Sequence, residues 1–174
     1  MATLNINGRK DDNKKDKWPK LVSLIRSKGV AIAGLQESHL NEEETTNLND
    51  RFQKVVVINN GSSTSKEGLA FVLNKELVNG MKWKHTVIIN ERASRLEIEM
   101  EKDRGINIVL VYAPNNETDK VAFWKLLKVK LQNIGEMENV IMMGDFNSIE
   151  NALDRCPHRV DDEKVKDAWK VIRN

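Results

Sequence analysis

The sequence predicts an α/β (α+β) protein in which two mixed β-sheets pack face to face with helices outside them, a four-layer α/β/β/α sandwich. Two observations point to this class. Some apolar runs are joined through helices, which is typical of parallel strands, whereas others alternate in polarity and follow one another directly, as in antiparallel hairpins. A single doubly wound sheet is disfavoured, because too few helices separate the strands in the middle of the chain.

Length and composition are those of one soluble globular domain, which we expect to span residues 1–174. Hydrophobic residues make up 40% of the chain and charged residues 31%, which is enough apolar material for a sizeable core. No apolar run approaches the length of a membrane span and no signal-peptide pattern opens the chain, so no membrane contact is expected. The net charge of +2 neither supports nor excludes nucleic acid as a partner.

Four helices are expected, three of them from apolar residues at helical spacing and one from a capping box. The first follows a charge-dense loop at residues 10–17, which we interpret as solvated, with contact to a phosphate backbone as the alternative. A second helix follows the capping box of Asn41 and Glu44. The apolar stripe of the first helix contains Trp18, Leu21, Val22 and Ile25. A later, long helix has the stripe Trp124, Leu127, Leu131 and Ile134. A final helix, capped by Asp161, has the stripe Val165, Ala168, Trp169 and Ile172. We interpret Trp18, Trp124 and Trp169 as core residues rather than base-stacking platforms.

Strands are expected where apolar runs lack the helical period. Residues 30–35 are wholly apolar, which predicts a strand buried on both faces. The run Val140–Met143 is likewise expected to be buried. The other strands are expected at residues 1–6, 55–58, 69–73, 83–89, 95–101 and 106–112.

Polar residues end several of these apolar runs, and the clearest case is Gly144-Asp145-Phe146-Asn147. Asp145 and Asn147 lie two residues apart, so they share a face if the extended geometry persists. Gly144 permits close approach of the backbone. The other runs end in Asn5 and Asn7; in Gln36 and Glu37; and in Tyr112, Pro114 and Asn115. With one cysteine, Cys156, and three histidines no zinc signature exists, so any metal would be a hard cation bound by oxygen.

The motifs TLNING, LQESH, VYAPN and GDFN, in this order and spacing, resemble the endonuclease/exonuclease/phosphatase superfamily, which has the deoxyribonuclease-I-like fold. Within it, the stretch GDFNSIENALDR and Trp124 are similar to the endonuclease domain of LINE-type non-LTR retrotransposons, the fungal elements in particular. The resemblance covers nearly the whole chain. It implies hydrolysis of a phosphodiester with a divalent metal, Mg²⁺ or Mn²⁺, and a DNA partner.

The same resemblance implies roles for individual residues. Glu37 would be a metal ligand, helped by Asn5 or Asn7. Asp145 would orient or deprotonate the attacking water or share the metal. Tyr112 would bind the phosphate or stabilise the leaving group through its hydroxyl. The expected catalytic set is Asn5, Glu37, Tyr112, Asp145 and Asn147, with Asn7 and Asn115 binding substrate and Glu37, Asp145 and Asn147 at the metal.

Each of these residues also has a purely structural interpretation. Asn5 and Asn7 can be turn residues at a strand end, and Asn115 can belong to a simple turn. Glu37 can be a solvated carboxylate, and Tyr112 can be a core aromatic with its hydroxyl at the surface. The ordered set of motifs favours the functional interpretation for the group as a whole.

The family's closing Ser-Asp-His motif does not occur in the sequence. We interpret His39 as structural and His85 as a packing residue of a strand, and His158 lies in a polar loop with no partner nearby in sequence. None of the three falls where a replacement for the missing histidine is expected. We therefore expect a domain incomplete at its C-terminal end and a fragment that is inactive, or nearly so, without that strand.

The functional hypothesis is a metal-dependent DNA-nicking endonuclease domain of a retrotransposon-type polyprotein. The alternatives are a phosphatase of the same superfamily acting on inositol phosphates or lipids, and a non-catalytic remnant that binds nucleic acid. No stable protein partner is inferred. A DNA substrate and a reduced Cys156 suggest an intracellular protein, nuclear or cytoplasmic.

Overall fold

The computed structural model describes residues 1–62, 67–100, 104–135, 137–148, 163–164 and 167. The final helix expected after Asp161, the stretch 149–162 and Cys156 lie outside these residues. In chain order the elements are β1 (Ala2–Asn5), α1 (Trp18–Ser27), β2 (Ile32–Gln36), α2 (Glu42–Arg51), β3 (Val55–Asn60), β4 (Leu69–Asn74), β5 (Lys82–Ile89), β6 (Ala93–Met100), β7 (Arg104–Tyr112), α3 (Glu117–Ile134) and β8 (Val140–Asp145).

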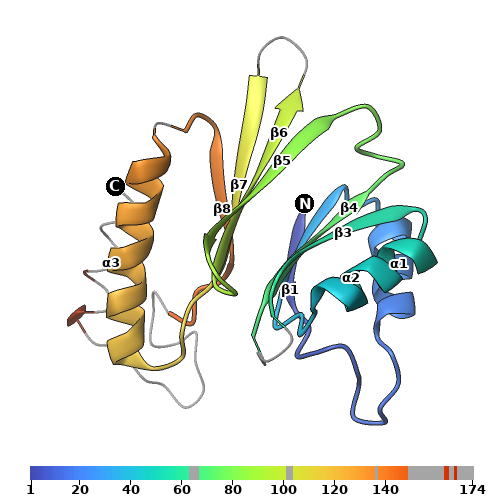
Figure 1. The fold of residues 1–174 in the computed structure, drawn as a ribbon, viewed down its shortest axis with the longest axis horizontal. Helices are drawn as coiled ribbons and strands as arrows, with labels where there is room; N and C mark the ends of the chain where they lie inside the picture. The colour runs from blue at the N-terminus through green and yellow to red at the C-terminus, as the bar shows by residue number, and fades with distance from the viewer. Residues whose placement is uncertain (63–66, 101–103, 136, 149–162, 165–166, 168–174) are drawn as a thin grey trace. The chain divides into compact units, whose positions relative to one another are not determined.

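The chain divides into two compact units. Unit 1 comprises Met1–Tyr112 and Glu138–Asp145, and unit 2 comprises Ala113–Met137 and Phe146–Asn174. Both sheets and the helices α1 and α2 belong to unit 1 (Figure 1), whereas α3 belongs to unit 2.

The first sheet of unit 1 has the strand order β1-β2-β4-β3. β1 runs parallel to β2, and the other two pairs are antiparallel. Every residue of β2 is buried, as its apolar sequence predicts, because β2 lies between two strands and has both faces covered.

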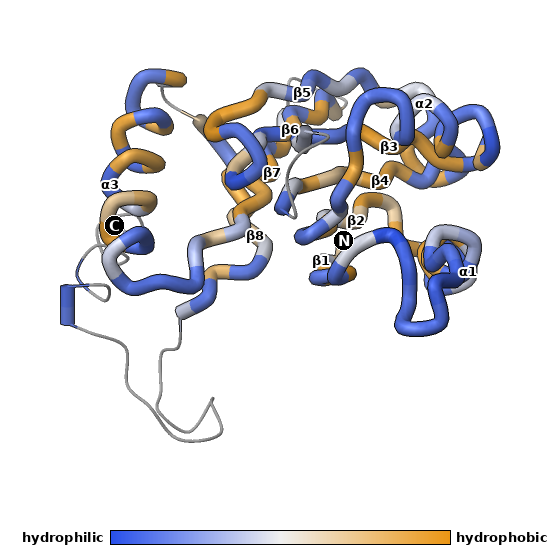
Figure 2. Tube along the Cα trace, turned by 60° about the horizontal axis from the view of Figure 1, so that its bottom comes forward, coloured by the Kyte–Doolittle hydropathy of each residue, from blue (hydrophilic) through white to orange (hydrophobic). Residues whose placement is uncertain are grey.

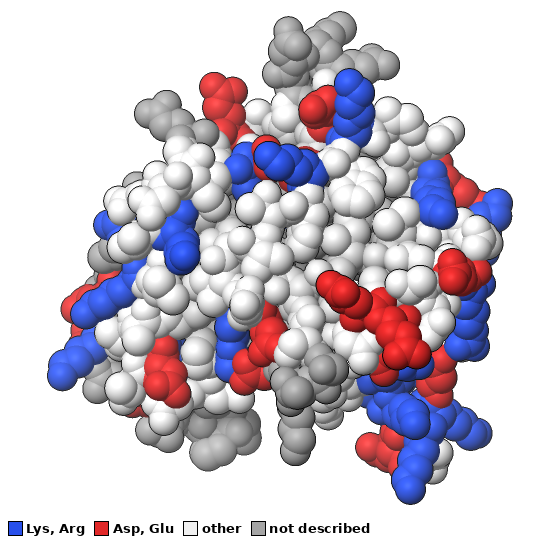
Figure 3. Space-filling view, in the orientation of Figure 1, with Lys and Arg blue, Asp and Glu red and all other residues white. Residues whose placement is uncertain are grey.

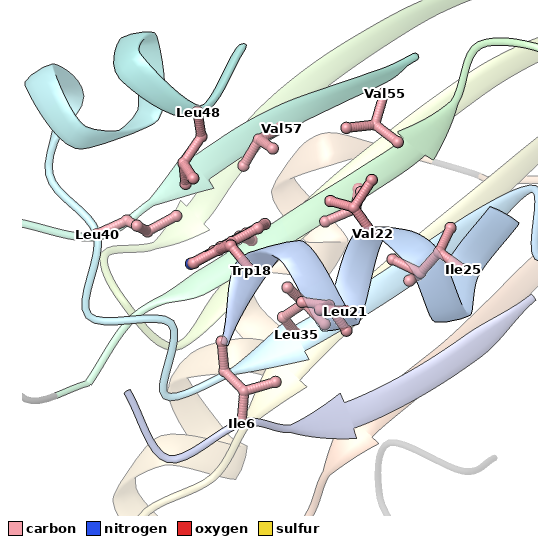
Figure 4. Packing of buried hydrophobic residues seen from close by; sticks show 13 residues of the cluster. Ile6, Trp18, Leu21, Val22, Ile25, Leu35, Leu40, Leu48, Val55 and Val57 are labelled. Atoms are coloured by element: carbon pink, nitrogen blue, oxygen red, sulfur yellow. The ribbon is translucent and has the colours of Figure 1, made fainter. Parts of the chain in front are cut away.

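Helices α1 and α2 cover one face of this sheet (Figure 4). Trp18 of α1 and Leu35 of β2 are fully buried there, and Leu48 of α2 is 2% exposed. The predicted capping box is present: the Asn41 side chain accepts from the Glu44 N–H, and the Glu44 carboxylate accepts from the Asn41 N–H. The apolar stripe of α1 and the start of α2 are therefore confirmed as the sequence predicts them.

The second sheet of unit 1 has the order β5-β6-β7-β8, with antiparallel β5, β6 and β7 and a parallel β7-β8 pair. β8 is the edge strand, and Val140 and Ile141 are 43% and 38% exposed. The expectation that the run Val140–Met143 is buried is therefore wrong, because its first two residues are exposed and Met142 and Met143 are only half-buried. An edge strand has a neighbour on one side only, and periodicity alone does not reveal which strand lies at the edge.

The two sheets pack against each other through a common core. Phe71 and Leu73 from β4 meet Leu96 from β6 and Leu110 from β7 in this cluster. At Gly34 of β2 an added Cβ would lie 2.5 Å from Leu110 Cδ1 and 2.8 Å from Met143 Cε, so the absence of a side chain permits the close contact between the sheets. The prediction of two packed mixed sheets with helices is confirmed.

The regular element of unit 2 in the described residues is α3. It follows the N-cap residue Asn116 and ends before the C-cap residue Gly135. The Asn116 side chain accepts hydrogen bonds from the backbone of Thr118 and Asp119. Figure 2 shows hydrophobic and hydrophilic turns alternating along α3, and Trp124 is fully buried. No helix in the described part of the chain combines the length and the hydropathy needed to cross a membrane.

Candidate functional site

Two carboxylates from different sheets meet at the side chain of Asn5, in unit 1. The Asn5 amide nitrogen Nδ2 donates to Glu37 Oε1 at 2.8 Å and to Asp145 Oδ2 at 3.3 Å. Asn5 and Asp145 are 140 positions apart in sequence, so this contact is a product of the fold. The structure therefore brings together three residues of the expected catalytic set, which lie at or directly after the ends of three different strands.

Tyr112 joins the same cluster through its hydroxyl, which donates to Glu37 Oε1 at 2.8 Å. The ring is buried at 6% exposure, so only the end of the side chain reaches the polar cluster. Burial raises the pKa of this hydroxyl well above its ordinary value of 10.0, and the hydrogen bond to Glu37 raises it further. Tyr112 is therefore a neutral hydrogen-bond donor at physiological pH.

The parallel strand pairs explain why these four side chains meet. β1 and β2 are parallel with Asn5 opposite Gln36, so Glu37 follows at the same sheet edge. β7 and β8 are parallel with Tyr112 opposite Asp145. Parallel strands present their carboxyl ends at one edge of a sheet. Each sheet therefore contributes one pair of site residues, which we call the Asn5–Glu37–Tyr112–Asp145 cluster.

The backbone at the cluster has conformations that are uncommon for residues with side chains. Glu37 has φ 52° and lies in the left-handed region. Gly144, beside Asp145, has φ 141°, and an added Cβ would lie 1.9 Å from the Val111 carbonyl oxygen. The glycine is required for the close pairing of β8 with β7 that brings Asp145 to Tyr112.

The chemistry of the cluster fits a hard divalent cation. Both carboxylate oxygens lie within 3.3 Å of one Asn5 nitrogen, which brings two acidic groups close together. Mg²⁺ is commonly held by one or two carboxylates, with water and substrate oxygens completing the shell. Among the described residues, no group of three or more His, Cys, Asp or Glu side chains is arranged to hold a metal ion. The protein ligands that the cluster offers are therefore Glu37, Asp145 and neighbouring amides.

The other expected site residues have different surroundings. The Asn7 backbone N–H donates to Asn5 Oδ1 at 3.0 Å, which orients the Asn5 side chain. Asn115 and Asn147 belong to unit 2. Asn115 is exposed, and Asn147 Nδ2 donates to the Ala113 carbonyl oxygen at 2.6 Å. The strand ends at Asp145 and Asn147 has φ 46°, so the extended geometry that would give Asp145 and Asn147 a common face does not persist.

Arg92 is a neighbour of the cluster that sequence reasoning missed. Its guanidinium carbon lies 4.9 Å from the centroid of the Tyr112 ring, and its Nη2 forms an ion pair with Glu67. The contact arises because β6 pairs with β7, where Ala93 is opposite Val111. Only knowledge of this register would have revealed Arg92 from the sequence.

The loop between β1 and α1 carries charges of both signs. Figure 3 shows Lys, Arg, Asp and Glu side chains gathered at the lower right, where Figure 1 draws this loop. Lys17 Nζ donates to the carbonyl oxygens of Ile6 and Asn7 at 2.7 and 2.9 Å, and Asp16 pairs with Arg51 at 2.6 Å. Part of the charge therefore holds the loop beside the end of β1.

The described histidines lie outside the hydrogen bonds of the cluster. His85 is packed edge-on to Phe71, with ring centroids 6.1 Å apart, as expected for a structural residue. His39 Nε2 is buried with no hydrogen-bond partner in the described part of the chain, and His39 Nδ1 is 2.8 Å from the position of a Cβ added to Gly8. His158 lies outside the described residues.

Comparison with known proteins agrees with the motifs and with the fold. A sequence model described as the endonuclease/exonuclease/phosphatase family matches residues 2–159. The transposon TX1 uncharacterized 149 kDa protein of Xenopus laevis is 27% identical over 158 residues, which cover 89% of this chain. The chain spans only 11% of that protein.

Three solved structures show the same fold. The endonuclease domain of TRAS1, a telomere-specific non-LTR retrotransposon, matches with a TM-score of 0.70 at 14% identity, covering 98% of this chain and 69% of that chain. An AP endonuclease from Archaeoglobus fulgidus matches with a TM-score of 0.68 at 17% identity, covering 98% and 68%. D. rerio TDP2 complexed with single strand DNA product matches with a TM-score of 0.63 at 18% identity, covering 97% and 63%.

Proposed function

Because the chain belongs to the endonuclease/exonuclease/phosphatase family, we propose that its Asn5–Glu37–Tyr112–Asp145 cluster hydrolyses phosphodiester bonds of DNA with a divalent cation, Mg²⁺ or Mn²⁺. The observation that carries the proposal is the shared hydrogen bonding of Asn5 to Glu37 and Asp145. A retrotransposon endonuclease domain and a protein complexed with a DNA product, both of the same fold, support DNA as the substrate.

The role of the two carboxylates is to hold the cation and the attacking water. Glu37 and Asp145 would be its protein ligands, since Asn5 Nδ2 donates to an oxygen of each. When bound, the cation would neutralise charge on the scissile phosphate and on the leaving oxygen. Asp145 would also orient the water and accept its proton.

The uncharged donors would act on the phosphate. Asn5 Nδ2 and the Tyr112 hydroxyl both donate to Glu37 in the free protein, so each is a neutral donor at the edge of the carboxylate pair. Donors of this kind stabilise negative charge that develops on oxygen during attack. Asn7 and Asn115 would hold the flanking DNA backbone.

The biological setting we propose is the endonuclease step of a retrotransposon-type protein. Hydrolysis would break the bond between phosphorus and the 3′ oxygen, and the resulting 3′-hydroxyl is the end that reverse transcription extends. The Xenopus laevis relative is a transposon protein of 149 kDa, of which the present chain corresponds to 11%.

A plasmid-nicking assay tests this function. Supercoiled plasmid is incubated with Mg²⁺ and either the 174-residue chain or a version extended by a Ser-Asp-His segment. We expect slow nicking at most by the first, since it contains no Ser-Asp-His sequence, and nicking by the second. Glu37→Gln and Asp145→Asn should abolish nicking in the extended version, whereas the exposed controls Glu99→Gln and Asp50→Asn should not.

Metal binding gives a readout that does not require turnover. Mn²⁺ titration followed by electron paramagnetic resonance should show a bound ion that is lost in Glu37→Gln and in Asp145→Asn. Phosphate release from inositol phosphates without plasmid nicking would replace the proposal with a phosphatase. Salt-sensitive DNA binding that is unchanged in both variants, with no nicking, would instead favour a non-catalytic binding module.

A further inference from the structure

Arg92 is held between the ring of Tyr112 and the carboxylate of Glu67. Its guanidinium carbon lies 4.9 Å from the ring centroid, within the range of a cation–π contact. Nη1 donates to the Tyr112 carbonyl oxygen at 3.4 Å, and Nη2 pairs with Glu67. The Tyr112 N–H donates to the Arg92 carbonyl oxygen at 2.8 Å, so backbone and side chain of Arg92 both contact Tyr112.

The turn that carries Arg92 is itself held by a buried amide. Asn60 is 6% exposed, and its Nδ2 donates to the carbonyl oxygens of Ile89 and Ala93 at 3.1 Å. Its Oδ1 accepts from the Glu91 N–H at 2.9 Å. A buried amide with these partners fixes the β5–β6 turn on the end of β3, so Arg92 has a defined backbone position.

The segment of Glu67 also supports the other side of the cluster. The Glu67 carbonyl oxygen accepts from the His39 N–H, and the Gly68 carbonyl oxygen accepts from the Ser38 N–H, each at 3.2 Å. Ser38 directly follows Glu37, whose Oε1 accepts the hydrogen bond of Tyr112. The backbone of Glu67 and Gly68 therefore holds the residues that follow Glu37. The Glu67 side chain holds Arg92, which contacts the ring of Tyr112.

We propose that Arg92, anchored by Glu67, is a positioning residue that fixes the direction of the Tyr112 hydroxyl toward Glu37. The catalytic consequence of this inference rests on the proposed function. A tyrosine ring that is held only through its own backbone can tilt, and this tilt moves the hydroxyl relative to its hydrogen-bond acceptor. A guanidinium over the ring face restricts that tilt, and the ion pair with Glu67 keeps the guanidinium in place.

The chain offers a selective probe of this arrangement, because Tyr112 is its single tyrosine. Protein labelled with 3-fluorotyrosine should give ¹⁹F resonances from this ring alone. We expect Arg92→Met to shift and broaden them, Glu67→Gln to do so to a smaller extent, and Arg92→Lys to restore part of the original spectrum. The control is Arg26→Met, which breaks the exposed ion pair of Arg26 with Glu76 and should leave the spectrum unchanged.

Kinetics of the extended, nicking version test the catalytic part. We expect Arg92→Met to lower kcat by about 10- to 100-fold, the loss typical of a misplaced reacting group, with KM nearly constant. In a Tyr112→Phe background the same substitution should have little further effect, because the hydroxyl that Arg92 positions is absent. Thermal unfolding of each variant confirms that the comparison is made on folded protein.

The possible outcomes separate the two proposals. An unchanged ¹⁹F spectrum in folded Arg92→Met would overturn the positioning role, with or without activity. A rise in KM that persists in the Tyr112→Phe background would also overturn it, since Arg92 would then contact the substrate directly. Altered spectra in a protein that never nicks DNA would leave the positioning of Tyr112 supported and refute the proposed function.

Discussion

The Tyr112 hydroxyl lies 2.8 Å from Glu37 Oε1, although the two residues are 75 positions apart in the chain and come from different sheets. The acceptor is a carboxylate, and hydrogen bonds to charged groups contribute about 1.5–3 kcal/mol. This contact therefore couples the stability of the fold to the arrangement of the proposed active site.

Tyr112 should make the protein sensitive to alkaline pH. Its folded-state pKa is raised, first by burial and then by Glu37, above the ordinary value of 10.0. The contribution of Tyr112 to the free energy of unfolding is therefore fully present below pH 10, and it falls as the pH rises toward the folded-state pKa. Urea unfolding between pH 9 and 11 should show a smaller decline in Tyr112→Phe than in the wild type. Equal declines would contradict the raised pKa.

His85 should make the protein sensitive to mild acid. Burial lowers the pKa of its imidazole below the ordinary value of 6.5, so the unfolded chain binds the proton more readily. The contribution of His85 to the free energy of unfolding should therefore be constant above pH 6.5 and fall as the pH is lowered from there. His85→Phe keeps an aromatic ring against Phe71 and should flatten this dependence. The measurement is the urea midpoint at pH values from 5 to 8.

Gly144→Ala should destabilise the protein more than another glycine substitution at positive φ. The new Cβ would lie 1.9 Å from the Val111 carbonyl oxygen, so β8 must move away from β7. Gly80 is the matched control, because its φ is 78° and nothing lies within 4 Å of an added Cβ. We expect Gly80→Ala to cost about 1 kcal/mol from backbone strain and Gly144→Ala to cost about 1–3 kcal/mol more from overpacking.

Chemical denaturation of both glycine variants measures this difference. In Gly144→Ala the displacement should also reach Asp145, so Mn²⁺ binding at the cluster should weaken. Gly80→Ala should bind Mn²⁺ like the wild type. Equal stability losses in the two variants would show that the clash at Val111 is relieved without cost.

Gly34→Ala should be rescued by a smaller residue in the opposite sheet. The added methyl group would meet the end of Leu110 at 2.5 Å, which is a flexible side chain rather than backbone. We expect the single variant to lose about 1–3 kcal/mol from overpacking of the inter-sheet core. Leu110→Val provides space, so the double variant should lose less than the sum of the single losses. Strict additivity in urea unfolding would contradict the contact.

The sequence was most informative where structure depends on nearby residues. The capping box of Asn41 and Glu44 is confirmed, because it involves residues three positions apart. The family resemblance is also confirmed, since four short motifs in a fixed order are specific together. The convergence of Asn5, Glu37 and Asp145 was predictable only through that resemblance, because each residue alone is compatible with an ordinary strand end.

Features that depend on the pairing of distant strands were not predictable. The exposure of Val140 and Ile141 follows from the edge position of β8, which the apolar run does not encode. The contact of Arg92 with Tyr112 follows from the register of β6 on β7. The change of direction after Asp145 follows from positive φ at Asn147, a conformation that Asn tolerates and that its presence alone does not specify.

The left-handed backbone at Glu37 has an evolutionary consequence. A glycine would adopt φ 52° with about 1–2 kcal/mol less strain, but it would remove the carboxylate that accepts from Tyr112 and Asn5, and hydrogen bonds to a charged group contribute about 1.5–3 kcal/mol. In a laboratory selection for heat resistance alone, glycine should therefore not replace Glu37, because the strained backbone holds an acceptor that the fold itself uses.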